Sequence, residues 1–532
     1  MWGIVMSSSM SGTTSPSSGS SATPTGDERP ELRGAGTEEL VALMQANGRG
    51  RQRGRMLALV GAVLGVVALG TGGFFAFNAL TDPGPQPESV LPSSTVAFVK
   101  VDLDPSASQK VDALRFLRSF PDAAKQLGAG SDLRKIAFEA VQKQGRLGKV
   151  DYAKDVAPWL GQRLGVGFVP EAAADEGAAP VLVLAVTDVD AAERHLPALA
   201  AGLGGQCRVL QAFAVCTGGT TATSLDKVVA DATRAPLADA ATFREDLGDL
   251  GDDGVVTAWV DSAKAGELIS RTSALTGSRV PVVKSADAGR TVMALRFDGP
   301  NLELAGHVNG AKGQATPAGN AGAIATLPWN TLAAVSVGGA GDGFTAAWPQ
   351  LQATIKASVG DKQYAAGLAD VQKTLGISVP KDVAAALGSQ FTVVFGGMEP
   401  GKGPRLAIVG DGDADVLRKV VGATAGLAGG GPATVHPAGG GTVVSLSDDY
   451  GQEVSTTHGL GDMPAFKDAI EHPESAQVAV YVDIAGLASQ FKDDLGTAKP
   501  ATTSVVDHLS ALGITATSDG SGGDFAIRLT TK

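Results

Sequence analysis

One glycine-rich segment has residue types that could bind a phosphate group. GGMEPGKG at 396–403 follows the spacing of a phosphate-binding loop as far as Lys402, but Gly403 stands where a serine or threonine would hold magnesium. Such a loop must open a helix whose N-terminal amides face the anion. Pro404 is instead followed by RLAIVG at 405–410, an apolar run typical of a strand. The segment is therefore predicted to be the turn of a β-hairpin.

Two serine–lysine pairs have the spacing in which a helical lysine deprotonates a serine in penicillin-recognising enzymes. They are Ser224 with Lys227 and Ser489 with Lys492. The Ser-Asp-Asn and Lys-Thr-Gly segments that accompany this chemistry are absent from the sequence, and so is the Gly-x-Ser-x-Gly motif of serine hydrolases. A serine-rich chain contains such pairs by chance, so we predict that neither pair is catalytic.

Metal-binding patterns are also incomplete. None of the six histidines forms a His-x-His or His-x-x-x-His pair. Asp411, Asp413 and Asp415 resemble the first ligands of a calcium loop, but the glycine and glutamate that complete such a loop are missing. Asp102 and Asp104 end an apolar run before a helical stretch, where carboxylates cap helices. Local sequence therefore predicts no catalytic, cofactor or metal site, and an active site assembled from distant residues stays an alternative.

The elements that carry these residues predict an α+β fold. Short alternating apolar runs, typical of strands, lie between alanine-rich stretches that are typical of helices. Loops such as the one at 170–180 join successive strands into hairpins, which indicates mainly antiparallel sheets with helices on their faces. Asp190 and Asp413 each precede a helical stretch and are predicted to be N-caps.

Four segments of the chain recur later in the same order, which is the signature of an internal repeat. The pairs are 91–101 with 327–337 (LPSSTVAFVKV and LPWNTLAAVSV), 154–169 with 381–396 (KDVAPWLGQRLGVGFV and KDVAAALGSQFTVVFG), 180–196 with 404–420, and 255–261 with 478–483. We therefore predict two tandem related α+β units.

The predicted units have a boundary in a glycine-rich segment. The first unit occupies 90–309 and the second 323–532, and GAKGQATPAGNAG at 310–322 is typical of a linker.

A long apolar segment predicts a membrane anchor. Residues 56–80 contain no charge, and their number exceeds the roughly 20 residues that a helix needs to cross a bilayer. Arg49, Arg51, Arg53 and Arg55 come just before this segment with no acidic residue among them, and such a cluster stays in the cytoplasm. We expect a single-pass signal anchor with a cytoplasmic N-terminus and an extracellular C-terminal ectodomain. A cleaved signal peptide is the alternative, but its apolar region is usually shorter.

The segments on either side of the anchor differ in composition from the rest. Residues 1–55 begin with a serine-, threonine- and proline-rich stretch that predicts a disordered cytoplasmic tail, with at most a short helix at 37–46. Residues 81–89 are proline-rich and predict a stiff stalk.

The two cysteines bracket a predicted hairpin. A two-residue turn at Gln211 and Ala212 would place Cys207 and Cys216 directly opposite each other, as a non-hydrogen-bonded pair close enough for a disulfide. Because this part of the chain is expected outside the cytoplasm, we predict that the disulfide forms. The second unit has no cysteine, so the bond is not a requirement of the fold.

The formal charge excludes one class of partner. The net charge is −12, and the region after the apolar segment has no basic stripe. Phosphate backbones repel such a surface, so nucleic-acid binding is not expected.

The beginning of the first unit resembles a known family. The segment 91–122 is similar to the start of an uncharacterised actinobacterial single-pass membrane-protein family, named only as a domain of unknown function, the thirty-three fifty-two family. The similar residues are Leu91-Pro92, Asp102-Leu103-Asp104-Pro105 and Phe116-Leu117-x-x-Phe120-Pro121. The resemblance implies a duplicated ectodomain, and it implies no established activity, catalytic residue or cofactor.

These observations together predict a function in the cell envelope. We expect a membrane-anchored, non-enzymatic extracytoplasmic protein that binds a protein, cell-wall or lipid component through its duplicated ectodomain. An extracytoplasmic enzyme with a dispersed active site and a lipid carrier are the alternatives.

Overall fold

The computed structural model describes twelve stretches of the chain, all within one compact unit, Asn47–Lys532. They are 84–120, 132–143, 150–171, 177–218, 224–251, 254–266, 288–312, 319–399, 403–427, 433–439, 441–491 and 505–532. The predicted anchor at 56–80, the cytoplasmic tail and Arg49, Arg51, Arg53 and Arg55 lie outside them. Among the described helices, none is both long enough and apolar enough to span a bilayer.

The first half of the described chain contains eight strands, with helical segments between them. The strands are β1 (Ala97–Asp102), β2 (Leu160–Pro170), β3 (Ala178–Val186), β4 (Gly205–Leu210), β5 (Phe213–Gly218), β6 (Val256–Asp261), β7 (Arg290–Asp298) and β8 (Asn301–Asn309). The helical segments are η1 (Pro87–Val90), α3 (Ala107–Arg118), α5 (Leu133–Lys143), η2 (Tyr152–Val156), α6 (Val189–Leu203), α7 (Leu225–Arg234), η3 (Leu237–Asp239) and α8 (Ala241–Leu250).

The second half of the described chain follows the same plan. Its strands are β9 (Ala333–Gly338), β10 (Gln390–Glu399), β11 (Gly403–Gly410), β12 (Thr434–Ala438), β13 (Gly441–Ser445), β14 (Val478–Asp483), β15 (Leu509–Ala516) and β16 (Gly523–Thr531). Its helical segments are η5 (Gly322–Thr326), α10 (Ala340–Val359), α11 (Asp361–Leu375), α12 (Lys381–Leu387), α13 (Ala414–Leu427), α14 (Asp448–Thr456), η6 (Leu460–Asp462), α15 (Pro464–Ala469) and α16 (Ile484–Gln490).

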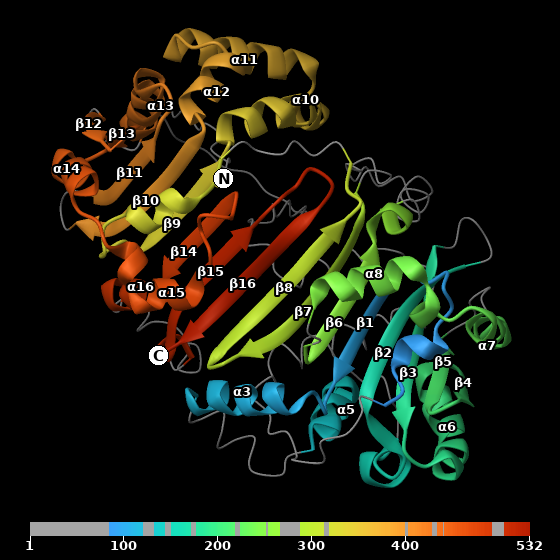
Figure 1. The fold of residues 1–532 in the computed structure, drawn as a ribbon. Coiled ribbons are helices and arrows are strands. Elements are labelled where there is room, and N and C mark those ends of the chain that lie inside the picture. The colour runs from blue at the N-terminus through green and yellow to red at the C-terminus, as the bar shows by residue number, and fades with distance from the viewer. Residues whose placement is uncertain are drawn as a thin grey trace, which may run out of the picture. The chain divides into compact units, whose positions relative to one another are not determined.

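All sixteen strands belong to one antiparallel sheet. The order is β12-β13-β11-β10-β9-β14-β15-β16-β8-β7-β6-β1-β2-β3-β5-β4, so each half has the same internal order and the halves meet at β8 and β16 (Figure 1). The α+β class and the antiparallel pairing are confirmed. The two halves share this single sheet, because the last strand of one half pairs with the last strand of the other.

The pairing registers of the two halves agree with most of the sequence matches. Ala97 pairs with Phe168 in the first half, and Ala333 pairs with Phe395 in the second, as the matched segments require. The β6 and β14 registers agree in the same way. The β3 match is displaced by two residues, because Pro180 lies opposite Phe168 but Leu406, not Pro404, lies opposite Phe395.

Helices cover both faces of the sheet over much of its width. On one face, η1, α7 and α8 bury the first-half strands, and η5, α14 and α15 bury the second-half strands. On the other face, α5 and α6 pack on β2, β3 and β5, α3 packs on β7, and α12 and α13 pack near β10 and β13. Alternating apolar residues on strands such as β3 supply side chains to both layers.

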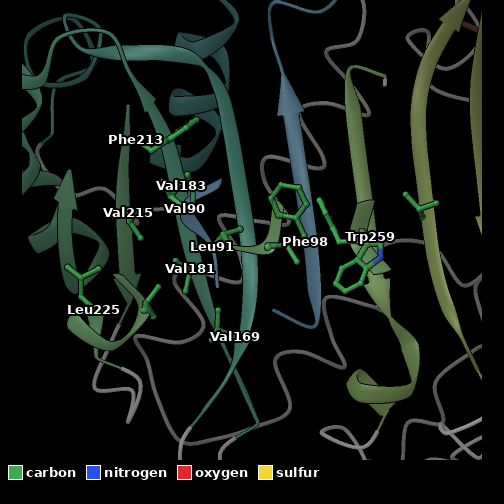
Figure 2. Packing of buried hydrophobic residues seen from close by; sticks show 14 of the residues in the cluster. Val90, Leu91, Phe98, Val169, Val181, Val183, Phe213, Val215, Leu225 and Trp259 are labelled. Atoms are coloured by element: carbon green, nitrogen blue, oxygen red, sulfur yellow. The ribbon is translucent and has the colours of Figure 1, made fainter. Parts of the chain in front are cut away.

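The first described segment belongs to this core, which corrects the predicted stalk. Pro87, Glu88 and Val90 are buried in η1, and Figure 2 shows Val90 among the strands of the first half. Lys100 of β1 is buried beneath η1, with its Nζ 3.7 Å from Glu88 Oε1 and donating to Gln86 Oε1 at 3.3 Å. The buried cation is thus paired, and the folded unit begins before residue 90.

Two predicted helix starts have different outcomes. Asp188, not Asp190, accepts from the Ala191 amide and caps α6, so that prediction is wrong by two residues. Asp413 accepts from the amide of Val416 at the start of α13, as predicted.

Candidate functional site

A pocket of about 240 Å³ lies where the two halves of the sheet meet, and we call it the junction pocket. Both halves contribute to it. It is lined by Asp249 and Leu250 of α8, Arg296 of β7, Glu303, Ala305, Gly306 and His307 of β8, Thr515 of β15, Thr517, and Asp524, Phe525 and Ala526 of β16.

The strands of this junction are related by a local twofold axis. Following the ladder outward from the matched strands β6 and β14, Val308 of β8 has the same position as Leu529 of β16. Ala305 then corresponds to Ala526, and these two residues lie opposite each other. Since equivalent residues meet only on a twofold axis, the axis passes between the two alanines.

Two ion pairs flank the alanines at equivalent positions. Two residues before each alanine there is an acid, Glu303 or Asp524, and two residues after it there is a base, His307 or Arg528. Arg528 Nε donates to Glu303 at 2.9 Å, and His307 Nδ1 lies 2.7 Å from Asp524 Oδ1. The junction is therefore self-complementary, because the acid of each strand pairs with the base of the other.

His307 is held from both sides of its ring. Its Nε2 lies 3.1 Å from Asn309 Oδ1, and the Asn309 amide nitrogen donates to Asp246 and Asp249 at 2.9 and 2.7 Å. Because that amide group faces two carboxylates, its oxygen must face His307, so both ring nitrogens meet acceptors. Burial lowers the pKa of His307, but Asp524, Asn309 and Asp249 outweigh burial and raise the pKa above its ordinary value.

The chemistry of the junction pocket follows from these contacts. With both ring nitrogens engaged by Asp524 and Asn309, His307 has no free nitrogen to act as a general base toward a ligand. Asp249 and Asp524 are exposed carboxylates at the rim, and Thr515 and Thr517 add hydroxyl groups. The pocket therefore presents hydrogen-bond acceptors to a ligand that carries donors, such as an ammonium or polyol group.

Arg528 forms the other of the two equivalent ion pairs of the junction, with Glu303. Its side chain is 9% exposed, and it also contacts Asp298 and Glu471, while Arg296 makes a second ion pair with Glu303. Its partners come from β7, β8 and the chain after α15, so Arg528 joins the two halves of the sheet.

A second pocket, of about 370 Å³, lies entirely in the second half. Arg405 stacks on the ring of Tyr450 at 4.6 Å and forms an ion pair with Glu453, which also accepts from Asn330. Burial raises the pKa of Tyr450, whose hydroxyl has no hydrogen-bond partner within the described chain. The corresponding position to Arg405 in the first half is Ala179, by the register of β3 and β11, so this pocket is not repeated.

The glycine-rich segment forms a hairpin, as predicted. β10 ends at Glu399 and β11 begins at Gly403, and these two residues pair. The strand β11, and not a helix, follows the segment directly, so it does not have the form of a phosphate-binding loop.

The other sequence motifs have structural roles where the structure describes them. Ser224 accepts from the Lys227 amide and caps α7, while Lys227 Nζ pairs with Asp231. Asp411 accepts from the amides of Ser389 and Gln390.

At the end of β1, Asp102 accepts hydrogen bonds from the Asp104 amide and from Arg163. The second serine–lysine pair cannot be placed, because Lys492 lies outside the described residues. Within the described ranges, no group of three or more His, Cys, Asp or Glu residues is arranged to hold a metal ion.

The structure contains a disulfide between Cys207 and Cys216. The two residues lie opposite each other in β4 and β5, with α-carbons 4.1 Å apart, and the turn between them is Gln211-Ala212. Gln211 has a left-handed backbone with φ of 54°, which is uncommon for glutamine. Cys216 is buried in the core that α6 covers.

Removing this disulfide should destabilise the first half. For Cys207→Ala with Cys216→Ala, we expect the free energy of unfolding to fall by about 2.5 kcal/mol, the loop-entropy value for a short loop. Urea unfolding with and without reductant measures it. Reductant should lower the free energy of unfolding of the wild type to that of the variant. If reductant leaves the wild-type value unchanged, the predicted contribution of the disulfide is contradicted.

Comparisons with known proteins do not identify the chain. No family model matches it, and no curated protein matches it. One solved structure with some likeness is "Structure of crystal form III of TP0453", at 11% identity over 43% of this chain and 81% of that chain, with a TM-score of 0.21. A likeness at that score indicates neither a shared fold nor a shared function.

Sequence reasoning missed the junction pocket. His307 and Asp524 are separated by 217 residues, so no local spacing relates them. The signal that could have found them is the alternation of β8, which places Glu303, Ala305, His307 and Asn309 on one face.

The charge of His307 makes the stability of the junction depend on pH. Its folded pKa is raised, so its contribution is fully present below its unfolded pKa of about 6.5 and is lost as pH rises through the folded value. The difference in unfolding free energy between wild type and His307→Gln should therefore shrink as pH rises from below about 6.5 through the raised folded pKa of His307. His307→Arg keeps the charge and should remove this pH dependence. A difference that grows with pH contradicts the assignment.

Proposed function

We propose that the chain is a membrane-anchored, non-enzymatic extracytoplasmic protein that binds an envelope component through a duplicated ectodomain. The apolar segment 56–80 and its preceding arginines support the anchor and the orientation. The repeated strand order and the matching registers support duplication of one ancestral unit. The disulfide supports an oxidising location outside the cytoplasm.

The junction pocket is the proposed binding site. The single observation that carries this proposal is that the pocket combines both halves around a histidine whose two ring nitrogens are already bound. A site of this kind can hold a ligand but has no free base in His307. The exposed Asp249 and Asp524 favour a partner that presents a basic group, such as a lysine side chain of an envelope protein.

Photocrosslinking in living cells tests the binding site. A photoreactive residue at Thr515, inside the pocket, should capture a partner, and the same residue at Arg418, exposed on α13, should not. Asp249→Asn with Asp524→Asn should reduce capture at Thr515 without unfolding the protein. Equal capture from both positions, or none from Thr515 in a folded protein, overturns the proposed site.

A separate measurement tests the anchor and the orientation. Ser521→Cys lies in an exposed turn, and both native cysteines are paired, so it provides one reactive thiol. A membrane-impermeant maleimide should label it in intact cells, whereas Ser9→Cys in the tail should need permeabilised cells. The opposite pattern refutes the orientation and leaves the binding test unaffected.

A further inference from the structure

One row of apolar side chains crosses the centre of the sheet on the face opposite α8 and α15. It runs through six neighbouring strands, from β10 to β8, and we call it the open row. Its members are Val393, Val335, Val480, Ile514, Ile527 and Leu304, each opposite the next in the ladder.

The open row is not part of any buried core in the described chain. Val335 is 40% exposed, and the other five side chains are only half-buried. Beyond each end of the open row, the next residue in the ladder packs against a core: Ile408 at one end and Leu295 at the other. A sheet face that is exposed to water normally carries polar residues, which alternate along each strand with the apolar residues of the buried face. Six consecutive aliphatic residues therefore indicate that this surface is covered in some state of the protein.

In the first half, a helix covers the surface that is equivalent to the open row. Val99 of β1 has the position of Val335, and it packs against the core beneath α3. α3 follows β1 directly, and it buries Ala113, Phe116 and Leu117, with the Phe116 ring 5.5 Å from that of Phe297.

α10 has the place of α3 in the second half but does not pack in the same way. It follows β9 directly, and its only buried residue is Gly341. Phe344, Trp348, Leu351 and Ile355 lie on one side of the helix, at the spacing of an apolar stripe, and Leu351 is 42% exposed. The packing partners of α10 are α12 and α11 rather than the strands.

We infer that α10 closes onto the open row in a second conformation of this chain, as α3 does in the first half. Both surfaces are apolar and incompletely covered, and five of the six strands of the open row belong to the same half as α10. The chain order that brings α3 to its strands is the same for α10. Closure buries both and removes apolar area from water.

The beginning of α10 has residues that permit such a movement. Gly339, just before the helix, has φ of 63°, a conformation that favours glycine, and Gly343 has open space around its α-carbon. Pro349 lies inside the helix and removes one backbone hydrogen bond there. These positions can absorb a change in helix direction.

Cysteine crosslinking of the full-length chain in membrane vesicles tests the closure. Leu351→Cys with Ile514→Cys should form an intramolecular disulfide, and Gln350→Cys with Ile514→Cys should not, because neighbouring helical residues point about 100° apart. We expect at least about tenfold more crosslink in the first pair, with a yield independent of dilution. If the Ile514 variant fails to fold, Ile527→Cys replaces it.

Three outcomes overturn the inference. Equal crosslinking of the two pairs means that the reaction does not report on the apolar side of α10. A disulfide formed only between chains means that a second copy covers the open row. Absence of any crosslink, together with a co-purifying lipid that protects Ile514→Cys from maleimide, means that an apolar ligand covers it.

Discussion

Replacing Arg528 with alanine is expected to lower the free energy of unfolding by about 3 kcal/mol, because it removes one partner of a buried ion pair. The Glu303 carboxylate opposite is 6% exposed and would keep only Arg296. Asp298 and Glu471 would lose a shared cation. Urea unfolding at neutral pH measures the change.

The control for Arg528 is an arginine in an ordinary surface pair. Arg418 of α13 is 49% exposed and pairs with the exposed Asp415 three residues before it. Its replacement by alanine should cost about 0.5 kcal/mol or less. If both variants cost the same, Arg528 does not hold the two halves together in the way that its contacts indicate.

Asp246→Ala should be comparably destabilising, by about 3 to 5 kcal/mol. The Asp246 carboxylate is 1% exposed and accepts from Trp259 Nε1 at 2.7 Å, from Arg290 Nε at 2.8 Å and from Asn309. Its loss leaves the buried indole N–H without an acceptor. Thermal and urea unfolding both measure the effect.

The adjacent Glu245 is a matched control for Asp246. It pairs with the same Arg290 at 3.0 Å from the same helix, but its side chain is 63% exposed, so Glu245→Ala should cost about 1 kcal/mol or less.

Asp246→Ala should also affect the junction pocket, whereas Glu245→Ala should not. Asp246 orients Asn309, which in turn binds His307, so the pKa of His307 should fall in an NMR titration of Asp246→Ala. An unchanged His307 titration in a folded Asp246→Ala variant would show that Asn309 is oriented without Asp246.

The hairpins and their registers follow from local sequence to a large extent. Alternating apolar runs and the loops between them predicted β10 with β11, and the turn at Gln211-Ala212 predicted the opposition of Cys207 and Cys216. Two local predictions were wrong. Asp188 caps α6 although Asp190 was predicted. η1, part of the predicted stalk, is buried because β2, β3, α7 and η3, which lie far along the chain, pack against it.

By itself, the sequence determined the α+β class, the antiparallel hairpins and the recurrence of four segments, because each depends on spacing over a few residues or on direct similarity. Only the tertiary structure decided that β8 pairs with β16, and thus that His307 meets Asp524 across 217 residues of chain. Contacts of that range depend on how two folded halves fit together, and an edge strand carries no local signal of the partner it will accept.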